Sequence, residues 1–470
     1  MNIKVFSLNR WRKKTLLSIH ILFIIFFLSV FNNTYSQLIF EKEEYAARRE
    51  KLMDQIPDGI LIIRGSAMPC NYTQFYQYNN MMYLSGVEIP DVILVVDGIK
   101  RKSTLFLTIS EKHAKSEGID LRLIRDTEGV TGIGNVFPLG DFSAFLDKIV
   151  KESEIIYAPF SSNELMAEVS REKNRSLLKS MTEDEWDGRE TREMQFINIL
   201  KGKYPGITVK DCSPIIWDLR KIKSKAEIDI MRECGRIGVE AHKAVMKATG
   251  VDVTERYLAN LFEFTCIDKG ANGLSYNTII MSDINHAYGH YHRYDRTLKD
   301  GDFIILDAGP DYQYYDVDIS TTFPANGKFS PQQRECYELA LLVSETCIKS
   351  YKPGITLADV GQKVKEVLVK NVYDPNVRRF RSWFKYGGYN HSIGMAVHDG
   401  MGTFDGTNEV LQPGFVFACD IMTRADSVTS VRIEETVVIT EDGCEVLSAG
   451  LPRSVKDIEA FMKKRPYSNR

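Results

Sequence analysis

The chain has 470 residues, which is enough to bury a sizeable core and to form at least two domains. Hydrophobic residues make up 44% and charged residues 26% of it, an ordinary globular composition that excludes a largely disordered chain. The formal net charge is only -3 and Lys and Arg occur in short scattered groups, so charge gives no reason to expect nucleic-acid binding. A small or peptidic partner therefore fits better than a polyanion.

The first 36 residues have the order of a secretory signal peptide. Basic residues between Lys4 and Lys14 precede an apolar run of 16 residues, Leu16–Phe31, and cleavage is expected after Ser36. The run is shorter than the roughly 20 residues that span a bilayer as a helix. We therefore expect an exported protein, periplasmic in its final location and without a stable membrane span after cleavage. An uncleaved N-terminal membrane anchor is the alternative.

Eight cysteines are spread along the chain without a Cys-x-x-Cys pair. This spacing is not typical of a dense disulfide scaffold or of a structural zinc site, and it leaves any pairing open. Most of the cysteines are expected to be small buried apolar residues.

Residues 37–210 are expected to form an α/β domain. A helix is predicted at 40–55, and apolar, β-branched runs predict strands at Gly59–Ile63 and Val92–Val96. Ile155–Ala158 continues this alternation of strand and helix. The region 164–203 is dense in charge and is predicted to form exposed helices.

Residues 211–470 contain predicted helices and strands in alternating groups. Ser224 with Glu227 three residues later has the pattern of a capping box and opens a long predicted helix. Further helices are predicted from Thr254 and from Ser330, which precedes a proline. Predicted strands lie between them, at Phe303–Leu306, Thr321–Phe323, Phe415–Cys419 and Glu435–Ile439. This order favours an α+β domain with a mainly antiparallel sheet.

Two acidic residues at strand ends are candidates for metal binding. Asp307 follows the apolar run Phe303–Leu306, and Asp318 comes eleven residues later, so a hairpin between the two segments would bring both carboxylates together. Two like charges in a semi-buried site are costly unless a cation neutralises them. Oxygen ligands with one imidazole favour Mn, Co or Zn. Taken alone, each Asp is more often a turn residue or a helix cap.

Several ordered motifs carry a resemblance to a known family. They are Lys223–Met231, Ser275–Ile279, Gly289–Tyr291, Leu298–Gly309, Asp318–Pro324, His391–Gly394, Val397–Asp399 and Arg432–Glu435. With them, residues 211–462 resemble the pita-bread catalytic domain shared by aminopeptidase P, prolidase and creatinase. Met82–Gly86, followed by Pro90–Asp91, is similar to the N-terminal domain of aminopeptidase P. The resemblance implies an α+β fold, in which a smaller creatinase-like α/β domain (37–210) precedes a pita-bread metallopeptidase domain (211–470).

The resemblance implies two divalent metal ions, Mn in the first place and Co or Zn as alternatives. The implied ligands are Asp307, Asp318, His391, Asp420 and Glu434. Asp318 and Glu434 would bridge the ions, Asp307 would hold one and His391 the other. His290 and His398 would bind the peptide and stabilise the tetrahedral intermediate, unless they are ordinary core or surface histidines. Arg432 would either fix a substrate carbonyl or pair with an acidic neighbour.

The chain departs from the family pattern at the fourth ligand. The family normally has Glu there, whereas the side chain of Asp420 is one methylene shorter and would ligate only with a shifted backbone or through water. The same residue would accept the proton of the attacking water, so both roles are affected. Thr321 stands where aminopeptidases P usually have Arg, and only 14 positions separate Asp420 from Glu434. These changes predict weaker occupancy of the second metal position, or a changed substrate, rather than complete loss of metal binding.

The sequence therefore predicts a metal-dependent exopeptidase that cleaves proline-containing peptides between an N-terminal residue and a following proline. We also expect a homo-oligomer, a dimer or larger. A prolidase-like dipeptidase is one alternative. The other is a catalytically impaired protein that binds peptides without turnover, and it depends on Asp420.

Overall fold

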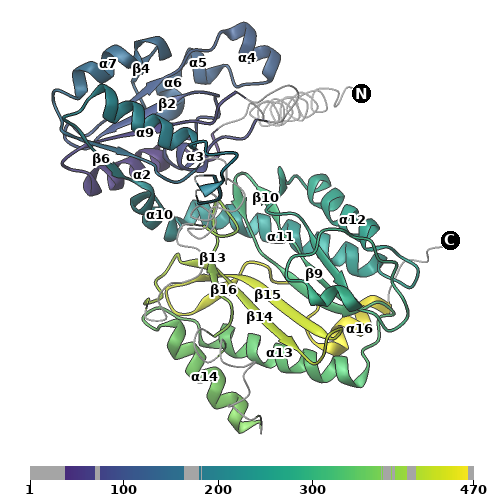
Figure 1. Cartoon of the computed structure of the whole chain (residues 1–470). Coiled ribbons are helices and arrows are strands. Elements are labelled where there is room, and N and C mark those ends of the chain that lie inside the picture. The colour runs from purple at the N-terminus through teal and green to yellow at the C-terminus, as the bar shows by residue number, and fades with distance from the viewer. Residues whose placement is uncertain are drawn as a thin grey trace, which may run out of the picture.

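The computed structural model describes residues 38–68, 75–162, 179–181, 183–371, 373, 383, 387–399 and 409–463. The predicted signal segment, Cys70 and residues 164–178 of the charged region lie outside this part of the chain. Figure 1 shows two domains, the first coloured purple to blue and the second teal to yellow. Among the helices of the described residues, none combines the length and apolarity that crossing a bilayer requires.

The described strands of the N-terminal domain form a mixed sheet in the order β4-β3-β2-β1-β5-β6. Its central strands β1 (Ile60–Arg64) and β2 (Ile93–Asp97) are antiparallel, while β5 (Ile155–Ala158) lies parallel to β1. The apolar, β-branched residues from which these strands were predicted are largely buried in the sheet. The other strands are β3 (Lys102–Phe106), β4 (Asn135–Phe137) and β6 (Thr208–Asp211).

The helices of this domain surround the sheet in Figure 1. They are α2 (Lys42–Gln55), α3 (Asn79–Ser85), α4 (Glu111–Glu117), α5 (Arg122–Arg125), α6 (Thr127–Thr131), η1 (Leu139–Asp141), α7 (Phe142–Ile149) and α9 (Arg192–Lys203). The helix predicted at 40–55 is confirmed as α2. Every residue of α3 is buried, because this short helix lies where the two domains meet.

In the C-terminal domain the described strands form an antiparallel sheet in the order β13-β14-β15-β12-β9-β8, with β16 beside β15. These strands are β8 (Ile279–Ser282), β9 (Phe303–Asp307), β12 (Ser320–Pro324), β13 (His391–Ser392), β14 (Val416–Arg424), β15 (Ser430–Ile439) and β16 (Cys444–Val446). A second, small sheet contains β7 (Gly273–Leu274), β10 (Pro310–Tyr312) and β11 (Tyr315–Asp316). The predicted antiparallel sheet is confirmed. Strands β14 and β15 are longer than predicted, because their polar ends do not continue the apolar pattern.

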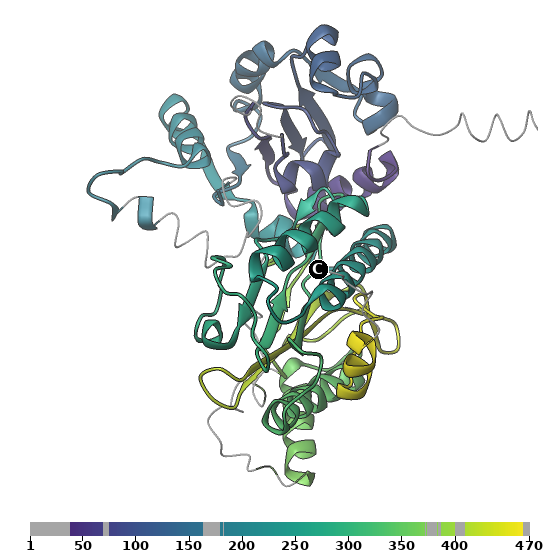
Figure 2. The ribbon, with the colours of Figure 1, turned by 90° about the vertical axis from the view of Figure 1, so that its right-hand side faces the viewer.

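The helices of the C-terminal domain begin largely where the sequence predicts. The capping boxes at Ser224 and Ser330 are both formed, and they open α11 (Lys225–Ala248) and α13 (Pro331–Ser350). The other helices are α10 (Ser213–Lys221), α12 (Glu255–Asp268), η3 (Asp283–Ala287), α14 (Leu357–Lys370) and α16 (Val455–Lys463). Helix α13 lies along β14 and β15, α11 lies beside β10, and α12 lies beside β7 and β8 (Figure 1). Figure 2 shows the N-terminal domain stacked on one end of this domain, with α14 at the opposite end.

Candidate metal centre

A row of polar side chains crosses four neighbouring strands of the C-terminal sheet. Asp420 in β14 lies directly opposite Glu434 in β15, Glu434 lies opposite Ser320 in β12, and Ser320 lies opposite Asp307 in β9. Directly opposite residues in an antiparallel sheet point to the same face. The side chains of these four residues are therefore brought together by strand register. The Ser320 hydroxyl donates to Glu434 Oε2 at 2.9 Å, which agrees with this arrangement.

Asp318 and His391 complete the cluster from the segments next to this row. Ligand atoms of Asp318, His391 and Glu434 all lie within 4.8 Å of one another. His391 Nε2 is 3.4 Å from Asp318 Oδ2 and 3.5 Å from Glu434 Oε1. The backbone of Asp318 is fixed by Thr436, whose hydroxyl accepts from the Asp318 N–H and donates to the Asp318 carbonyl, both at 2.9 Å. All five predicted ligands are buried, and the hairpin expected to join Asp307 and Asp318 is present.

Arg432 lies among the carboxylates and contacts three of them. Its guanidinium pairs with Asp307, donates through Nη2 to Asp420 Oδ2 at 2.8 Å, and places Nε 3.5 Å from Glu434 Oε2. Burial by itself lowers the pKa of Arg432, but these carboxylates outweigh it and hold the pKa well above its usual value. Of the two roles weighed for Arg432, pairing with acidic neighbours is therefore the one that the geometry favours.

Tyr276 is a site residue to which the sequence analysis gave no role. Its hydroxyl reaches both Asp307 Oδ1 and Asp318 Oδ1. A hydroxyl has a single hydrogen, so it can donate to only one of these oxygens at a time. Tyr276 belongs to the quoted motif Ser275–Ile279, so a signal was present. What the motif did not reveal was that its side chain joins two carboxylates from other strands.

The remaining predicted site residues differ in their placement. His398 is half-buried and its ring lies 4.1 Å from that of His391, centroid to centroid, with 35° between the planes. His290 is exposed, in the segment between η3 and β9. Thr321 is buried in β12 and its hydroxyl is 2.9 Å from Nδ1 of the buried His242 in α11. The structure therefore brings His398 to the ligand cluster, and it leaves His290 exposed in the segment between η3 and β9.

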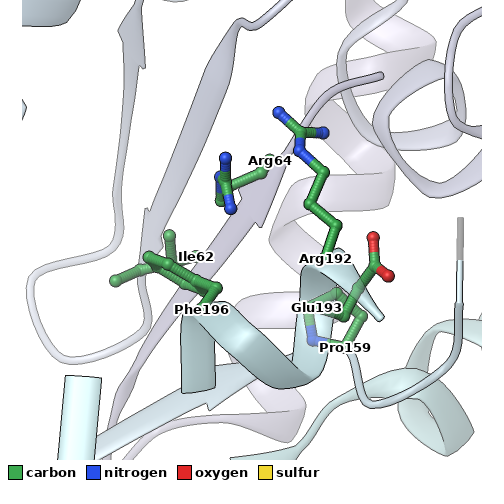
Figure 3. Close-up of a pocket in the computed structure, with 6 residues that line it drawn as sticks. All are labelled: Ile62, Arg64, Pro159, Arg192, Glu193 and Phe196. Atoms are coloured by element: carbon green, nitrogen blue, oxygen red, sulfur yellow. The ribbon is translucent and has the colours of Figure 1, made fainter. Parts of the chain in front are cut away.

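A pocket elsewhere in the molecule contains none of the predicted site residues. It lies in the N-terminal domain between β1 and α9, and it leaves room for little more than one water molecule. Figure 3 shows its lining, in which the guanidinium groups of Arg64 and Arg192 face each other across the opening above Phe196. It is small and unconnected with the carboxylate row, so we do not treat it as the reaction site.

The donor set fits divalent metal ions. Asp420 Oδ1, Glu434 Oε1 and His391 Nε2 are buried, and no hydrogen-bond partner for them exists within the described residues. Burial also raises the pKa of Asp307 to about 6 and that of Asp420 to about 7, although Arg432 acts to lower both. Buried polar atoms and buried like charges are costly unless they are paired or coordinate a cation. Four carboxylates and one imidazole supply the oxygen and nitrogen ligands that Mn, Co or Zn accept.

Comparison with known proteins gives two family matches. Residues 45–157 match the aminopeptidase P N-terminal domain. Residues 229–441 match metallopeptidase family M24. The first match covers most of the N-terminal sheet, and the second contains all five predicted ligands.

Individual relatives are similar over most of their length. Xaa-Pro aminopeptidase 3 of Homo sapiens is 29% identical, over 88% of this chain and 85% of the relative. Xaa-Pro dipeptidase of Rattus norvegicus is 30% identical, over 63% of this chain and 71% of the relative. Among solved structures, proline aminopeptidase P II from Yersinia pestis superposes with a TM-score of 0.73, covering 90% of this chain and all (100%) of that one at 24% identity. The expected fold, a pita-bread domain after a creatinase-like N-terminal domain, is confirmed.

Proposed function

The chain belongs to metallopeptidase family M24 and is a metal-dependent peptidase. From this we propose that it removes the N-terminal residue of peptides whose second residue is proline. The relatives named for Xaa-Pro bonds include both aminopeptidases and a dipeptidase. The similarity to the aminopeptidase extends over 88% of this chain and the similarity to the dipeptidase over 63%, and we take the longer match as support for aminopeptidase activity.

The observation that carries this proposal is the register of the carboxylate row. Asp420, Glu434 and Asp307 share one face of the sheet, and Asp318 and His391 meet them there. We propose that this cluster would hold two divalent ions, with Asp318 and Glu434 as ligands common to both, Asp307 as a ligand of one and His391 as a ligand of the other. Manganese is our first choice of metal, and cobalt or zinc would suit the same ligands.

Bound divalent ions would supply positive charge that lowers the pKa of water and polarises a peptide carbonyl. The residues of the chain define what surrounds that chemistry. Asp420, whose Oδ1 is left without a partner by the described residues, is the proposed fourth ligand and the acceptor of the proton of the attacking water. Arg432 holds the opposite oxygen of the same carboxylate and so fixes its orientation.

We propose that the histidines stabilise the negative charge that develops on the carbonyl oxygen. His398, whose ring lies against that of His391 at a tilt of 35°, is close enough to the ligand cluster to donate there, and an imidazole N–H is a suitable donor for an oxyanion. His290 would approach with the bound peptide from the exposed segment after η3. In this assignment His290 and His398 bind substrate, and Arg432 acts through the carboxylates.

Further expectations remain proposals of the same kind. We propose domain limits of 37–210 and 211–470, removal of residues 1–36 on export to the periplasm, and assembly into a homo-oligomer. We also keep the dipeptidase and the impaired peptide-binding protein as competing functions. The first competitor predicts hydrolysis of dipeptides only, and the second predicts binding without hydrolysis.

The test is hydrolysis of a short peptide panel by the purified mature chain with added Mn. We expect release of the N-terminal residue from Ala-Pro-Ala and no cleavage of Ala-Ala-Ala, which lacks proline. Cleavage of Ala-Pro alone would replace the aminopeptidase with a dipeptidase. If the wild-type chain binds Ala-Pro-Ala but does not cleave it, the substitution Asp420→Glu separates the remaining readings. Gained hydrolysis would mark an impaired enzyme, and none in either form would contradict the proposed activity.

A further inference from the structure

The segment 391–399 carries two of the three histidines assigned to the candidate site, His391 and His398, and folds back on itself. It starts at β13, where Ile393 N–H donates to the Val416 carbonyl at 3.2 Å, and its last residue returns to the start, because Asp399 N–H donates to the Ser392 carbonyl at 2.9 Å. His391 is thus anchored by the sheet, whereas His398 lies at the far end of a loop. Whatever holds the end of this loop sets the position of His398.

The side chain of Asp399 fills the inside of this loop. Its carboxylate is buried, and Oδ2 accepts from the Met395 N–H at 3.0 Å. A side chain at Gly394 would put its Cβ 2.2 Å from the same oxygen, so the absence of a side chain there makes room for the carboxylate. Asp399 therefore ties the middle of the loop to its end.

The other carboxylate oxygen is held from outside the loop. Arg220 in α10 places Nη2 2.6 Å from Asp399 Oδ1, without the linear N–H geometry of a hydrogen bond, and both side chains are almost fully buried. Arg220 Nη1 donates to Asn80 Oδ1 in α3 at 2.8 Å. Removing one partner of a buried ion pair leaves an uncompensated charge, which is far more disruptive than loss of a surface pair. Lys223 is a second buried cation near Asp399, and burial lowers the pKa of Lys223 to about 8 while Asp399 opposes that shift.

A second contact joins the same loop to the N-terminal domain. The Asn79 side-chain amide, also in α3, donates to the Met395 carbonyl at 2.6 Å. Ala396 packs against Trp217 of α10. Residues of both α3 and α10 therefore contact the loop.

We propose that Asp399 is a positioning residue for His398, and that Arg220 and Asn80 make the N-terminal domain part of the support on which the catalytic histidine depends. The proposal rests on the function proposed above, since it assigns a consequence for turnover. It goes beyond that function because it gives the N-terminal domain a role in the geometry of the reaction site. Neither Asp399 nor Arg220 contacts the ligand cluster in this arrangement, so both act through the loop.

The first test measures the loop directly and does not need activity. Hydrogen exchange of the segment 387–399 is compared in the wild-type chain and in the variant Asp399→Asn, which keeps the shape of the side chain and removes its charge. We expect exchange in this segment to accelerate by about tenfold or more, with little change elsewhere. The matched control is Arg48→Met, because Arg48 is also a buried arginine between the domains but contacts the Tyr83 carbonyl and Glu227 instead of the loop. Unchanged exchange in Asp399→Asn would overturn the proposal, as would equal acceleration in the Arg48→Met control.

The second test separates positioning from general destabilisation. In Asp399→Asn we expect kcat to fall by about 10- to 100-fold with the metal content kept, because His391 remains anchored in the sheet. Arg220→Lys should show a smaller loss in the same direction, since one ammonium cannot hold both Asn80 and Asp399 in the fork geometry of arginine. Loss of metal together with kcat would show that the site collapses as a whole and would contradict positioning. A wild-type chain without activity would refute the proposed function, while the exchange experiment would still decide the role of Asp399.

Discussion

The two parts of the candidate site are held in place by different means. The carboxylate row at Asp307, Ser320, Glu434 and Asp420 is set by backbone hydrogen bonds between four strands. The loop that ends in His398 is closed by backbone hydrogen bonds at its ends, but its interior depends on a side chain, through Asp399 and its contacts with Arg220 and the Met395 N–H. Both regions are buried and both carry chemistry, but only the first draws its geometry from the sheet itself.

This difference teaches where single substitutions should act. A side chain in the row can be changed without moving its neighbours, because the strand pairing that positions them does not depend on it. A side chain that fills the loop, such as Asp399, cannot be changed in this way, because the position of the loop depends on it. We therefore expect changes in the row to affect metal and chemistry with the fold unaltered, and changes under the loop to affect chemistry through displacement.

The largest effect is expected at the centre of the row. Glu434→Gln removes the proposed bridging charge, and hydrolysis should fall by more than about 100-fold, beyond the cost typical of residues that only support metal ligands. The metal-free variant should unfold at the same temperature as the metal-free wild type or a few degrees higher. Burial, and in addition the negative charge of Glu434, raise the pKa of Asp307 and Asp420, and the substitution removes that charge. Calorimetry of the two metal-free proteins checks this, and a large fall in unfolding temperature would break the contrast between the two regions.

A change inside the loop should have the next largest effect. In Gly394→Ala the new Cβ would lie 2.2 Å from Asp399 Oδ2, so the carboxylate must move and His398 with it. We expect kcat to fall by about 10- to 100-fold while the metal content stays as in the wild type. Steady-state kinetics beside elemental analysis provides the measurement. Wild-type kinetics in this variant would mean that the loop does not depend on Asp399.

A smaller effect is expected from the hydroxyl that joins two strands. Tyr276→Phe removes the group that reaches Asp307 and Asp318, and we expect an activity loss of about tenfold, at the lower end for support of metal ligands. The row should stay in register because its backbone pairing is untouched. Titration with Mn, followed by activity, distinguishes weaker metal binding from slower chemistry. An unchanged affinity and rate would show that Tyr276 is a bystander.

The smallest effect is expected where the chain departs from its family. Asp420→Glu lengthens the side chain by one methylene at a position already fixed by its pairing with Glu434. Activity should rise by no more than about tenfold, because Arg432 already orients the shorter carboxylate. Rates of the two proteins on the same Xaa-Pro peptide give the comparison. A gain of several orders of magnitude would mean that Asp420 fails as a ligand in the natural chain.

Local patterns in the sequence predicted much of the scaffold and one member of the row, Asp307, whereas Asp420 and Glu434 were implied only by the resemblance to the family. The capping boxes at Ser224 and Ser330, the apolar strand before Asp307 and the hairpin to Asp318 all have short-range signatures, and each is present. Predictions of strand ends were poorer at β14 and β15, because Asp420 and Glu434 interrupt the apolar pattern although they lie on the strands.

The support of the loop could not be predicted in this way. Arg220 and Asp399 are far apart in the chain, and nothing in the residues around either one indicates the other. The same holds for Asn79 and the Met395 carbonyl, which meet only once the N-terminal domain is docked. Long-range pairing of single polar groups is a property of the packed fold, so it becomes visible only in three dimensions.

The most direct measurement is the number of metal ions bound by the purified mature chain after equilibration with Mn, determined by elemental analysis beside the variant Glu434→Gln. Two ions per wild-type chain, and a clear loss in the variant, are the result predicted for a two-metal centre on the carboxylate row. No bound ion in the wild-type chain, or equal metal content in the two proteins, would contradict it.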